Sequence, residues 1–197
     1  MKNPFLSPRY RLSLPQSLLA AVLLSGGITL LALWCQPNSF RELLSGFLRQ
    51  PLLIVLNALP IGLLILAAAA LFRSVFFGAA LVNLAAGALS IANRLKLEVR
   101  DEPVFPRDFA LLKEVGSALE SYDIRFPLPQ IAAVVLVTTA LLALGFLIGC
   151  EPFPAEKLRG WAGSLLGAAA ALAALTGLIL TLYASKDLYQ SFQVRNA

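Results

Sequence analysis

In the stretch LLIVLNALPIGLLILAAAALFRSVFFGAALVNLAAGALSIAN, residues 52–93, Arg73 is the only charged residue. The apolar runs on either side of Arg73 are each close to the ~20 residues that an α-helix needs to cross the ~30 Å hydrocarbon layer. A helix also satisfies its own backbone hydrogen bonds, which lipid cannot do. The stretch therefore predicts two membrane-spanning helices, Leu52–Phe72 and Ser74–Asn93, joined by a tight hairpin at Arg73.

Three more charge-free runs of similar length lie on either side of this hairpin, at Leu14–Cys35, Leu128–Cys150 and Trp161–Tyr183. The whole chain of 197 residues is 58% hydrophobic and only 14% charged, whereas about a quarter of the residues in a typical soluble domain are charged. The sequence thus predicts an all-α membrane protein with five transmembrane helices over residues 14–183. The first run is longer than the 7–15 apolar residues of a signal peptide, so it is interpreted as an anchoring helix.

The distribution of charge predicts how the helices are oriented. Residues 1–13 contain Lys2, Arg9 and Arg11 and no acidic residue, which favours a cytoplasmic N-terminal tail. Five crossings then place residues 184–197 outside the cell, together with the loop 94–127. That loop holds six basic and seven acidic residues, so its basic residues alone oppose this orientation. Membrane proteins commonly carry Lys and Arg at their cytoplasmic ends, so the net charge of +5 does not indicate nucleic-acid binding.

Two polar segments show the periodicity of amphipathic helices. The first covers about residues 39–49, where Ser39 and Glu42 match a capping box. The second covers about residues 108–122, where Asp108 is a suitable N-cap and one apolar stripe contains Leu111, Leu112, Val115, Leu119 and Tyr122. Both are expected to lie flat at the membrane surface. The alternative is that they are ordinary helices capping the bundle.

Polar residues within the runs are interpreted mainly as packing features. Asn57 and Asn83 are expected to hydrogen-bond to neighbouring helices rather than to a ligand, and Gly163, Gly167 and Ala171 to allow close helix contact. Cys35 is expected at the outer end of the first span and Cys150 at the inner end of the fourth, too far apart for a disulfide.

The polar block after the third run has a distinctive spacing. Its pattern is N-x-x-K-x-x-x-R followed by E-P-x-x-P-x-D, and Pro103 and Pro106 keep the residues before them extended. This arrangement resembles the membrane domain of the lipoteichoic acid synthase-like proteins, which are sulfatase-type phosphoglycerol transferases of the alkaline phosphatase superfamily. The resemblance extends from about residue 14 to residue 183, and its matching residues are Asn93, Lys96, Arg100, Pro103, Pro106, Asp108 and Glu114.

The resemblance implies a location in the bacterial cell membrane and a role in anchoring an enzyme and presenting lipid, with phosphatidylglycerol as the candidate lipid. It also implies an extracellular catalytic domain after the fifth span, with a threonine nucleophile and a divalent metal, typically manganese. This chain contains no His, which excludes a His-based metal site. Residues 184–197 are therefore expected to begin an extracellular linker, and the chain alone, without a cofactor of its own, is expected to be inactive.

The candidate headgroup contacts are Asn93, Lys96, Arg100 and Asp108, because a cation at the lipid surface has phosphate within reach. For Lys96 and Arg100 the alternative is a solvated flank that neutralises Asp101 and Glu102. Two other functions remain open. The first is a stand-alone membrane interaction protein that binds a partner or anionic lipid, and the second is a small transporter component. The transporter is least favoured, because no span has a titratable group at mid-depth.

Overall fold

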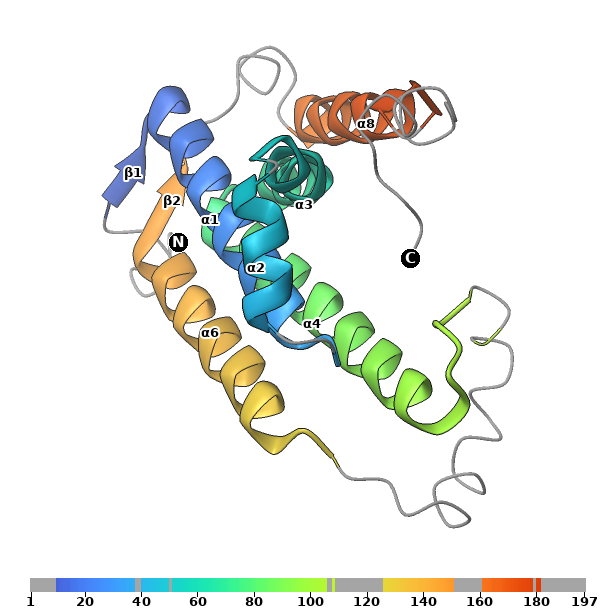
Figure 1. The fold of residues 1–197 in the computed structure, drawn as a ribbon. Coiled ribbons are helices and arrows are strands. Elements are labelled where there is room, and N and C mark those ends of the chain that lie inside the picture. Colours follow the sequence, from blue (N-terminus) through green and yellow to red (C-terminus); the bar gives the residue numbers. More distant parts are fainter. Residues whose placement is uncertain are drawn as a thin grey trace.

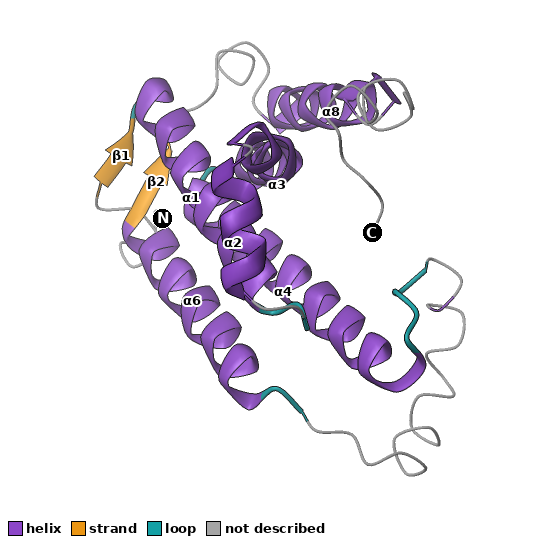
Figure 2. Ribbon diagram, viewed as in Figure 1, coloured by secondary structure: helices purple, strands orange, loops and turns teal. Residues whose placement is uncertain are grey.

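The structure is a computed structural model that describes residues 10–37, 40–49, 51–105, 108, 126–150, 161–178 and 180–181. Helices dominate this part of the chain (Figure 2). Six helices and two short strands are described, and their bounds are α1 Leu14–Trp34, α2 Phe40–Arg49, α3 Pro51–Phe72, α4 Val75–Arg100, α6 Leu128–Leu147, α8 Trp161–Leu178, β1 Tyr10–Leu12 and β2 Ile148–Cys150.

Four of these helices, α1, α3, α4 and α6, are long and apolar enough to cross a membrane. The chain is therefore a multi-pass membrane protein, as the charge-free runs predicted. The fifth expected span coincides with α8, which has 18 described residues and is near the lower end of the ~17–25 residues that suffice for a crossing. Residues 179, 182 and 183 of that span lie outside the described residues, so a fifth crossing stays a prediction.

The core is formed where α1, α3 and α4 pack together, as Figure 1 shows. Helix α6 packs on α4 and α8 packs on α3, so these two helices flank the core. The contacts rely on small residues, as expected for helices in lipid. A Cβ on Gly78 would lie 2.7 Å from the carbonyl oxygen of Ile65, and a Cβ on Gly167 would meet Ala70 at 3.6 Å. Gly167 therefore faces Ala70 of α3, but a Cβ there would meet Ala70 at an ordinary van der Waals distance, so this contact does not require a glycine.

The hairpin predicted at Arg73 is confirmed. Helix α3 ends at Phe72 and α4 begins at Val75, while Arg73 adopts a left-handed backbone with φ 54°. Ser74 is the N-cap of α4, and its Oγ accepts a hydrogen bond from the Phe77 N–H at 3.5 Å. The same Oγ donates to the Ile148 carbonyl oxygen at 3.1 Å, which places the end of α6 beside the hairpin.

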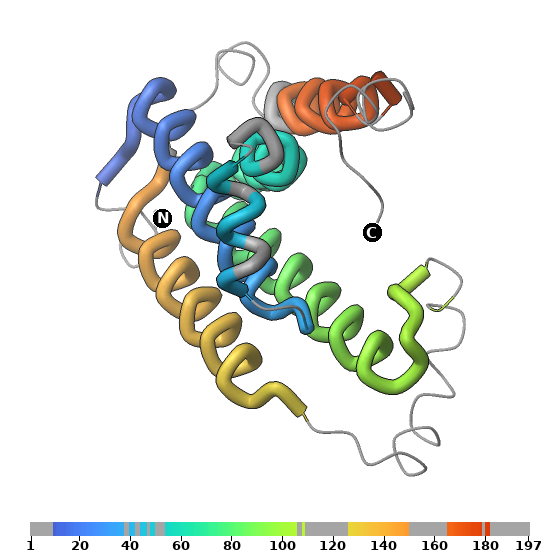
Figure 3. The backbone as a smooth tube through the Cα atoms, viewed as in Figure 1, coloured from blue at the N-terminus to red at the C-terminus, as the bar shows by residue number. Residues whose placement is uncertain are grey.

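A parallel two-stranded ladder, which the sequence did not predict, joins β1 to β2, with Tyr10 opposite Ile148 and Leu12 opposite Cys150. The fourth helix therefore ends at Leu147 and not at Cys150. The strands form because α1 and α6 bring two extended segments together at one end of the molecule, visible beside each other in Figure 3. We call this end, with Ser13, Ser74 and Ile148, the hairpin end.

The opposite end carries Gln36 and Asn93, whose side chains are hydrogen-bonded. We call it the strap end. Cys35 is buried there as a free thiol, whereas Cys150 belongs to β2 at the hairpin end. The two cysteines therefore lie at opposite ends, as predicted.

The prediction that the third helix ends at Asn93 is wrong, because α4 continues for two more turns to Arg100. Residues 94–100 are therefore helical and do not belong to a loop. They contain good helix formers and an i,i+4 pair in which the Arg94 Nε lies 2.8 Å from Glu98 Oε1. The helix stops at Asp101, which has φ 52° and donates its N–H to the Leu97 carbonyl oxygen.

The first amphipathic helix is confirmed as α2, although Ser39 of its predicted capping box lies outside the described residues. Helix α2 packs against α3 and α1. Arg41 and Arg49 are exposed and Leu44 is partly buried, while Leu48 is 69% exposed. The second amphipathic helix, at about residues 108–122, lies outside the described residues except for Asp108.

Candidate functional site

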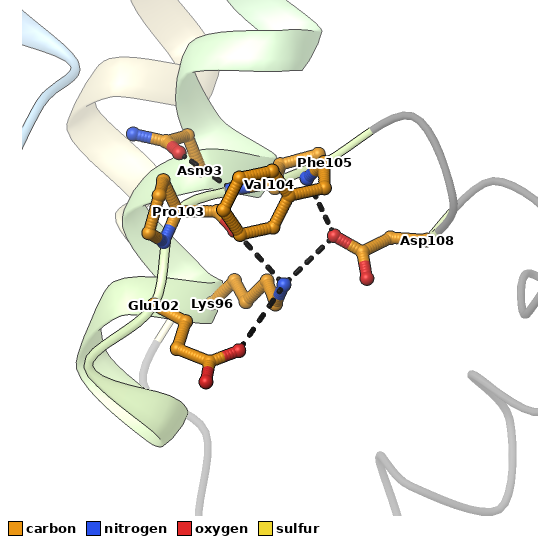
Figure 4. A network of polar contacts seen from close by, with 7 residues as sticks. All are labelled: Asn93, Lys96, Glu102, Pro103, Val104, Phe105 and Asp108. Atoms are coloured by element: carbon orange, nitrogen blue, oxygen red, sulfur yellow. Dashed lines mark hydrogen bonds and ion pairs between the residues drawn. The ribbon is translucent and has the colours of Figure 1, made fainter.

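The side chain of Asn93 connects three segments at the strap end. Its Nδ2 donates to Gln36 Oε1 at 3.0 Å, and its Oδ1 accepts a hydrogen bond from the Val104 N–H at 2.9 Å. Gln36 directly follows α1, while Val104 follows α4. We call the described residues that fold back onto α4, namely Glu102, Pro103, Val104, Phe105 and Asp108, the strap (Figure 4). Asn93 therefore ties the strap both to α4 and to the end of α1.

Lys96 lies one turn after Asn93 and makes most of the remaining strap contacts. Its Nζ donates to the Pro103 carbonyl oxygen at 2.9 Å and to Asp108 Oδ2 at 2.7 Å. The Nζ also lies 4.0 Å from Glu102 Oε2 and 5.2 Å from the centre of the Phe105 ring. Only 14% of the Lys96 side chain is exposed. Its ammonium group is therefore directed into the strap (Figure 4).

Asp108 completes the network through one carboxylate oxygen. Besides the Lys96 ammonium, Oδ2 accepts a hydrogen bond from the Phe105 N–H at 2.6 Å. The Asp108 N–H in turn donates to the Phe105 carbonyl oxygen at 2.9 Å. These reciprocal bonds form a turn, and the carboxylate faces a cation and a backbone donor together. Such a pair of donors can hold an anionic oxygen by charge-assisted hydrogen bonding.

The sequence explains why the strap folds here. Asn93 and Lys96 are three residues apart on a helix, so their side chains lie on the same face. The left-handed conformation of Asp101 ends α4 and reverses the chain. Pro103 then restricts Glu102 to extended conformations. The chain consequently returns along the face of α4 that carries the two side chains.

The structure brings together three of the four predicted headgroup contacts. Asn93, Lys96 and Asp108 share the network, whereas Arg100 is exposed on the last turn of α4. Contact of any of these residues with lipid stays a prediction. The other predicted residues, Leu111, Leu112, Val115, Leu119 and Tyr122, lie outside the described residues, as do Pro106 and Glu114 of the matched pattern.

The sequence reasoning missed Gln36 and the backbone N–H groups of Val104 and Phe105. Gln36 is the first polar residue after a charge-free run, but nothing in that position indicates a partner 57 residues away. The backbone donors carry no sequence signal, because every residue except proline has one.

The polar contact inside the membrane region is separate from the strap. Asn83 is buried and its Nδ2 donates to Thr138 Oγ1 at 2.9 Å and to the Val134 carbonyl oxygen at 3.3 Å. Thr138 Oγ1 donates to the same carbonyl oxygen at 2.8 Å. The prediction that Asn83 bonds to a neighbouring helix is confirmed, and it joins α4 to α6.

Metal-binding groups do not cluster in the described part of the chain. No three His, Cys, Asp or Glu residues come together there in a way that could hold a metal ion. In the structure the Lys96 ammonium and the Phe105 N–H both donate to the Asp108 carboxylate. Comparison of the chain with protein-family models, with curated proteins and with solved structures gives no match.

Proposed function

We propose that this chain is the membrane-anchoring and lipid-presenting domain of a lipoteichoic acid synthase-like phosphoglycerol transferase. The observation that supports the proposal is the strap. Four of the residues that carry the resemblance to that family belong to one network, although they include an amide, an ammonium, a proline and a carboxylate. They are Asn93, Lys96, Pro103 and Asp108. A shared structural task explains why residues of these types occur at this spacing.

The physical role of the strap follows from its position. Helix α4 has 26 residues and at 1.5 Å per residue is about 39 Å long, which exceeds the ~30 Å hydrocarbon layer. Its last turns therefore extend into the headgroup region. The strap fixes a polar segment there, next to the phosphates of the bilayer. In the proposed orientation the N-terminus is cytoplasmic and the strap end faces outward.

Catalysis in this proposal belongs to an extracellular domain joined after the membrane region. That domain would supply the threonine nucleophile and the divalent metal, typically manganese, and phosphatidylglycerol would donate the phosphoglycerol group. The membrane domain would keep the catalytic domain at a fixed position relative to the lipid surface. The chain by itself has no His to serve as a metal ligand or general base.

The decisive experiment identifies the protein that carries the strap in its native membrane. An antibody against the peptide of residues 98–108 recovers it, and peptide mass mapping defines its full extent. The recovered protein is given labelled phosphatidylglycerol and manganese. We expect a sulfatase-type domain beyond the membrane region and transfer of labelled phosphoglycerol, while residues 1–197 alone give no transfer.

Two results contradict the proposal. Transfer of label by purified residues 1–197, after repurification, would place catalysis within this chain. Recovery of a native protein that has no catalytic domain and no transfer activity would favour a stand-alone membrane interaction protein.

A further inference from the structure

The Asp108 carboxylate occupies a position that suits a bound anion. Its Oδ2 lies 2.7 Å from the Lys96 Nζ and 2.6 Å from the Phe105 N. An ammonium group and a backbone N–H that converge on one oxygen form a small anion site. The site lies at the rim of the fold, because the side chains of Lys96 and Asp108 are 14% and 23% exposed.

We propose that Lys96 and the Phe105 N–H form a phosphate-binding site that Asp108 closes from within the chain. The Asp108 carboxylate oxygen stands in for a phosphate oxygen, which would accept the same two hydrogen bonds. A lipid phosphodiester or a soluble phosphate displaces Asp108 from Lys96, and Asp108 returns when the phosphate leaves. No covalent bond is made or broken.

The position of the site along α4 matches the depth of lipid phosphates. At 1.5 Å per residue, Lys96 lies about 32 Å along the axis from Val75, where α4 begins at the hairpin end. The hydrocarbon layer is ~30 Å thick. Lys96 therefore reaches the headgroup layer of the outer leaflet in the proposed orientation.

The ion pair of Lys96 with Asp108 and the attraction of Lys96 to an anionic lipid are of similar strength, so Asp108 and a phosphate can exchange at the site. An ion pair near the surface changes an equilibrium by about fivefold or less. Attraction of one basic residue to an anionic lipid surface is of similar size, about fivefold. Because these effects oppose each other, the occupant of the site depends on how much phosphate faces the strap.

Exchange would loosen only part of the strap. The Val104 N–H is held by Asn93, and Asn93 also bonds to Gln36, so these contacts do not require Asp108. Phosphate binding would therefore release Asp108, while Val104 of the strap stays bonded to Asn93 on α4. The inference rests on the membrane placement in the proposed function, but it does not require phosphoglycerol transfer.

The test compares the selectivity for anionic lipid in four forms of the full chain: the reference, Asp108→Asn, Lys96→Gln and the double variant. Each is placed in nanodiscs and carries Trp161→Phe, so that Trp34, at the strap end of α1, is its only tryptophan. Quenching of Trp34 by brominated phosphatidylglycerol, relative to brominated phosphatidylcholine, gives the selectivity. Asp108→Asn should raise it by about fivefold, since Lys96 loses its internal competitor.

The other variants show whether Lys96 mediates the effect. Lys96→Gln should lower the selectivity, and the double variant should match Lys96→Gln, because the proposed effect of Asp108→Asn acts through the Lys96 ammonium. Asp101→Asn is the control of equal charge, since it removes one negative charge at the same helix end and Asn also tolerates a left-handed backbone. It should change the selectivity much less than Asp108→Asn. An equal effect of both substitutions, or no effect of Asp108→Asn, would overturn the proposal.

A second measurement identifies the source of the phosphate. Hydrogen exchange at the Phe105 amide is followed in neutral nanodiscs with added inorganic phosphate, and separately in nanodiscs containing phosphatidylglycerol. A change in either arm that is lost in Lys96→Gln supports the site and names its source. No change in both arms would overturn it. This outcome is independent of the transfer assay, so the site and the proposed function are tested separately.

Discussion

Among single residues, two adjacent threonines on α6 differ in their surroundings, since one contacts a neighbouring helix and the other lies on the outer face of the bundle. Thr138 is buried and bonded to Asn83, whereas Thr139 is exposed, and each Oγ1 donates at 2.8 Å to the carbonyl oxygen four residues earlier. Thr138→Val should destabilise the fold by about 1 kcal/mol, the usual size of a hydrogen bond between membrane helices. Unfolding in mixed detergent measures the effect. Thr139→Val is the control and should leave stability nearly unchanged, and equal losses would contradict the role of Asn83.

Gly87 provides a steric test of the same α4–α6 contact. A Cβ at this position would lie 2.6 Å from Val134 Cγ1, so Gly87→Ala should cost about 1–3 kcal/mol through overpacking. Adding Val134→Ala should restore part of the loss, because it removes the colliding methyl groups. Gly27→Ala is the control, since a Cβ there meets no atom of the described residues within 4 Å. Stability is again measured by unfolding, and a tolerated Gly87→Ala would show that the helices are farther apart.

At the scale of elements, the extension of α4 beyond Asn93 is open to a direct test. Asp101 ends the helix in a left-handed conformation, which costs non-glycine residues roughly 1 kcal/mol. Asp101→Gly should therefore slow hydrogen exchange in the last turn of α4 by about fivefold. Asp101→Ala, which keeps a Cβ and loses the polar side chain, should not. Fast exchange throughout residues 95–100 in the unmodified chain would show that the helix ends earlier.

The end of α4 also shows that a hydropathy pattern does not locate the end of a helix. Charged residues begin at Arg94, so the apolar run and the membrane span end near Asn93. A helix does not have to end where its apolar run ends, because its backbone bonds persist in water when good helix formers follow. Hydropathy locates the lipid boundary, whereas the Asp101 backbone locates the helix end.

At the scale of the whole molecule, the two ends of the bundle should differ in accessibility. The hairpin end contains Tyr10 and the strap end contains Arg100, while Leu48 lies on α2, in the connection from α1 to α3; all three are exposed. Single cysteines at these positions, in a chain with Cys35 and Cys150 replaced by Ser, are labelled with an impermeant reagent in intact cells. In the proposed orientation the strap end and the connection from α1 to α3 face outward, so position 10 should be protected and positions 48 and 100 should be labelled. The reverse pattern would invert the proposed orientation.

The number of crossings is tested with a reporter fused after Ala197. If α8 crosses the membrane, the reporter lies on the same side as position 48. If α8 only packs against α3 without crossing, the reporter lies on the side of position 10. Permeabilised cells are the control, since there every site becomes accessible.

That this chain is a helical membrane protein follows from local features of its sequence. Charge-free runs near 20 residues and the hairpin at Arg73 follow from the cost of placing charges and free backbone groups in lipid, and these are local properties. It also grouped Asn93, Lys96, Arg100 and Asp108 as candidate headgroup contacts, and three of these four residues, all but Arg100, share the strap network. Which atoms meet depends on how the helices pack. The pairing of β1 with β2, the bond from Asn93 to Gln36 and the ion pair of Lys96 with Asp108 join segments that are separated in the sequence. Such contacts depend on how the helices pack, and no periodicity or composition encodes a partner at that distance.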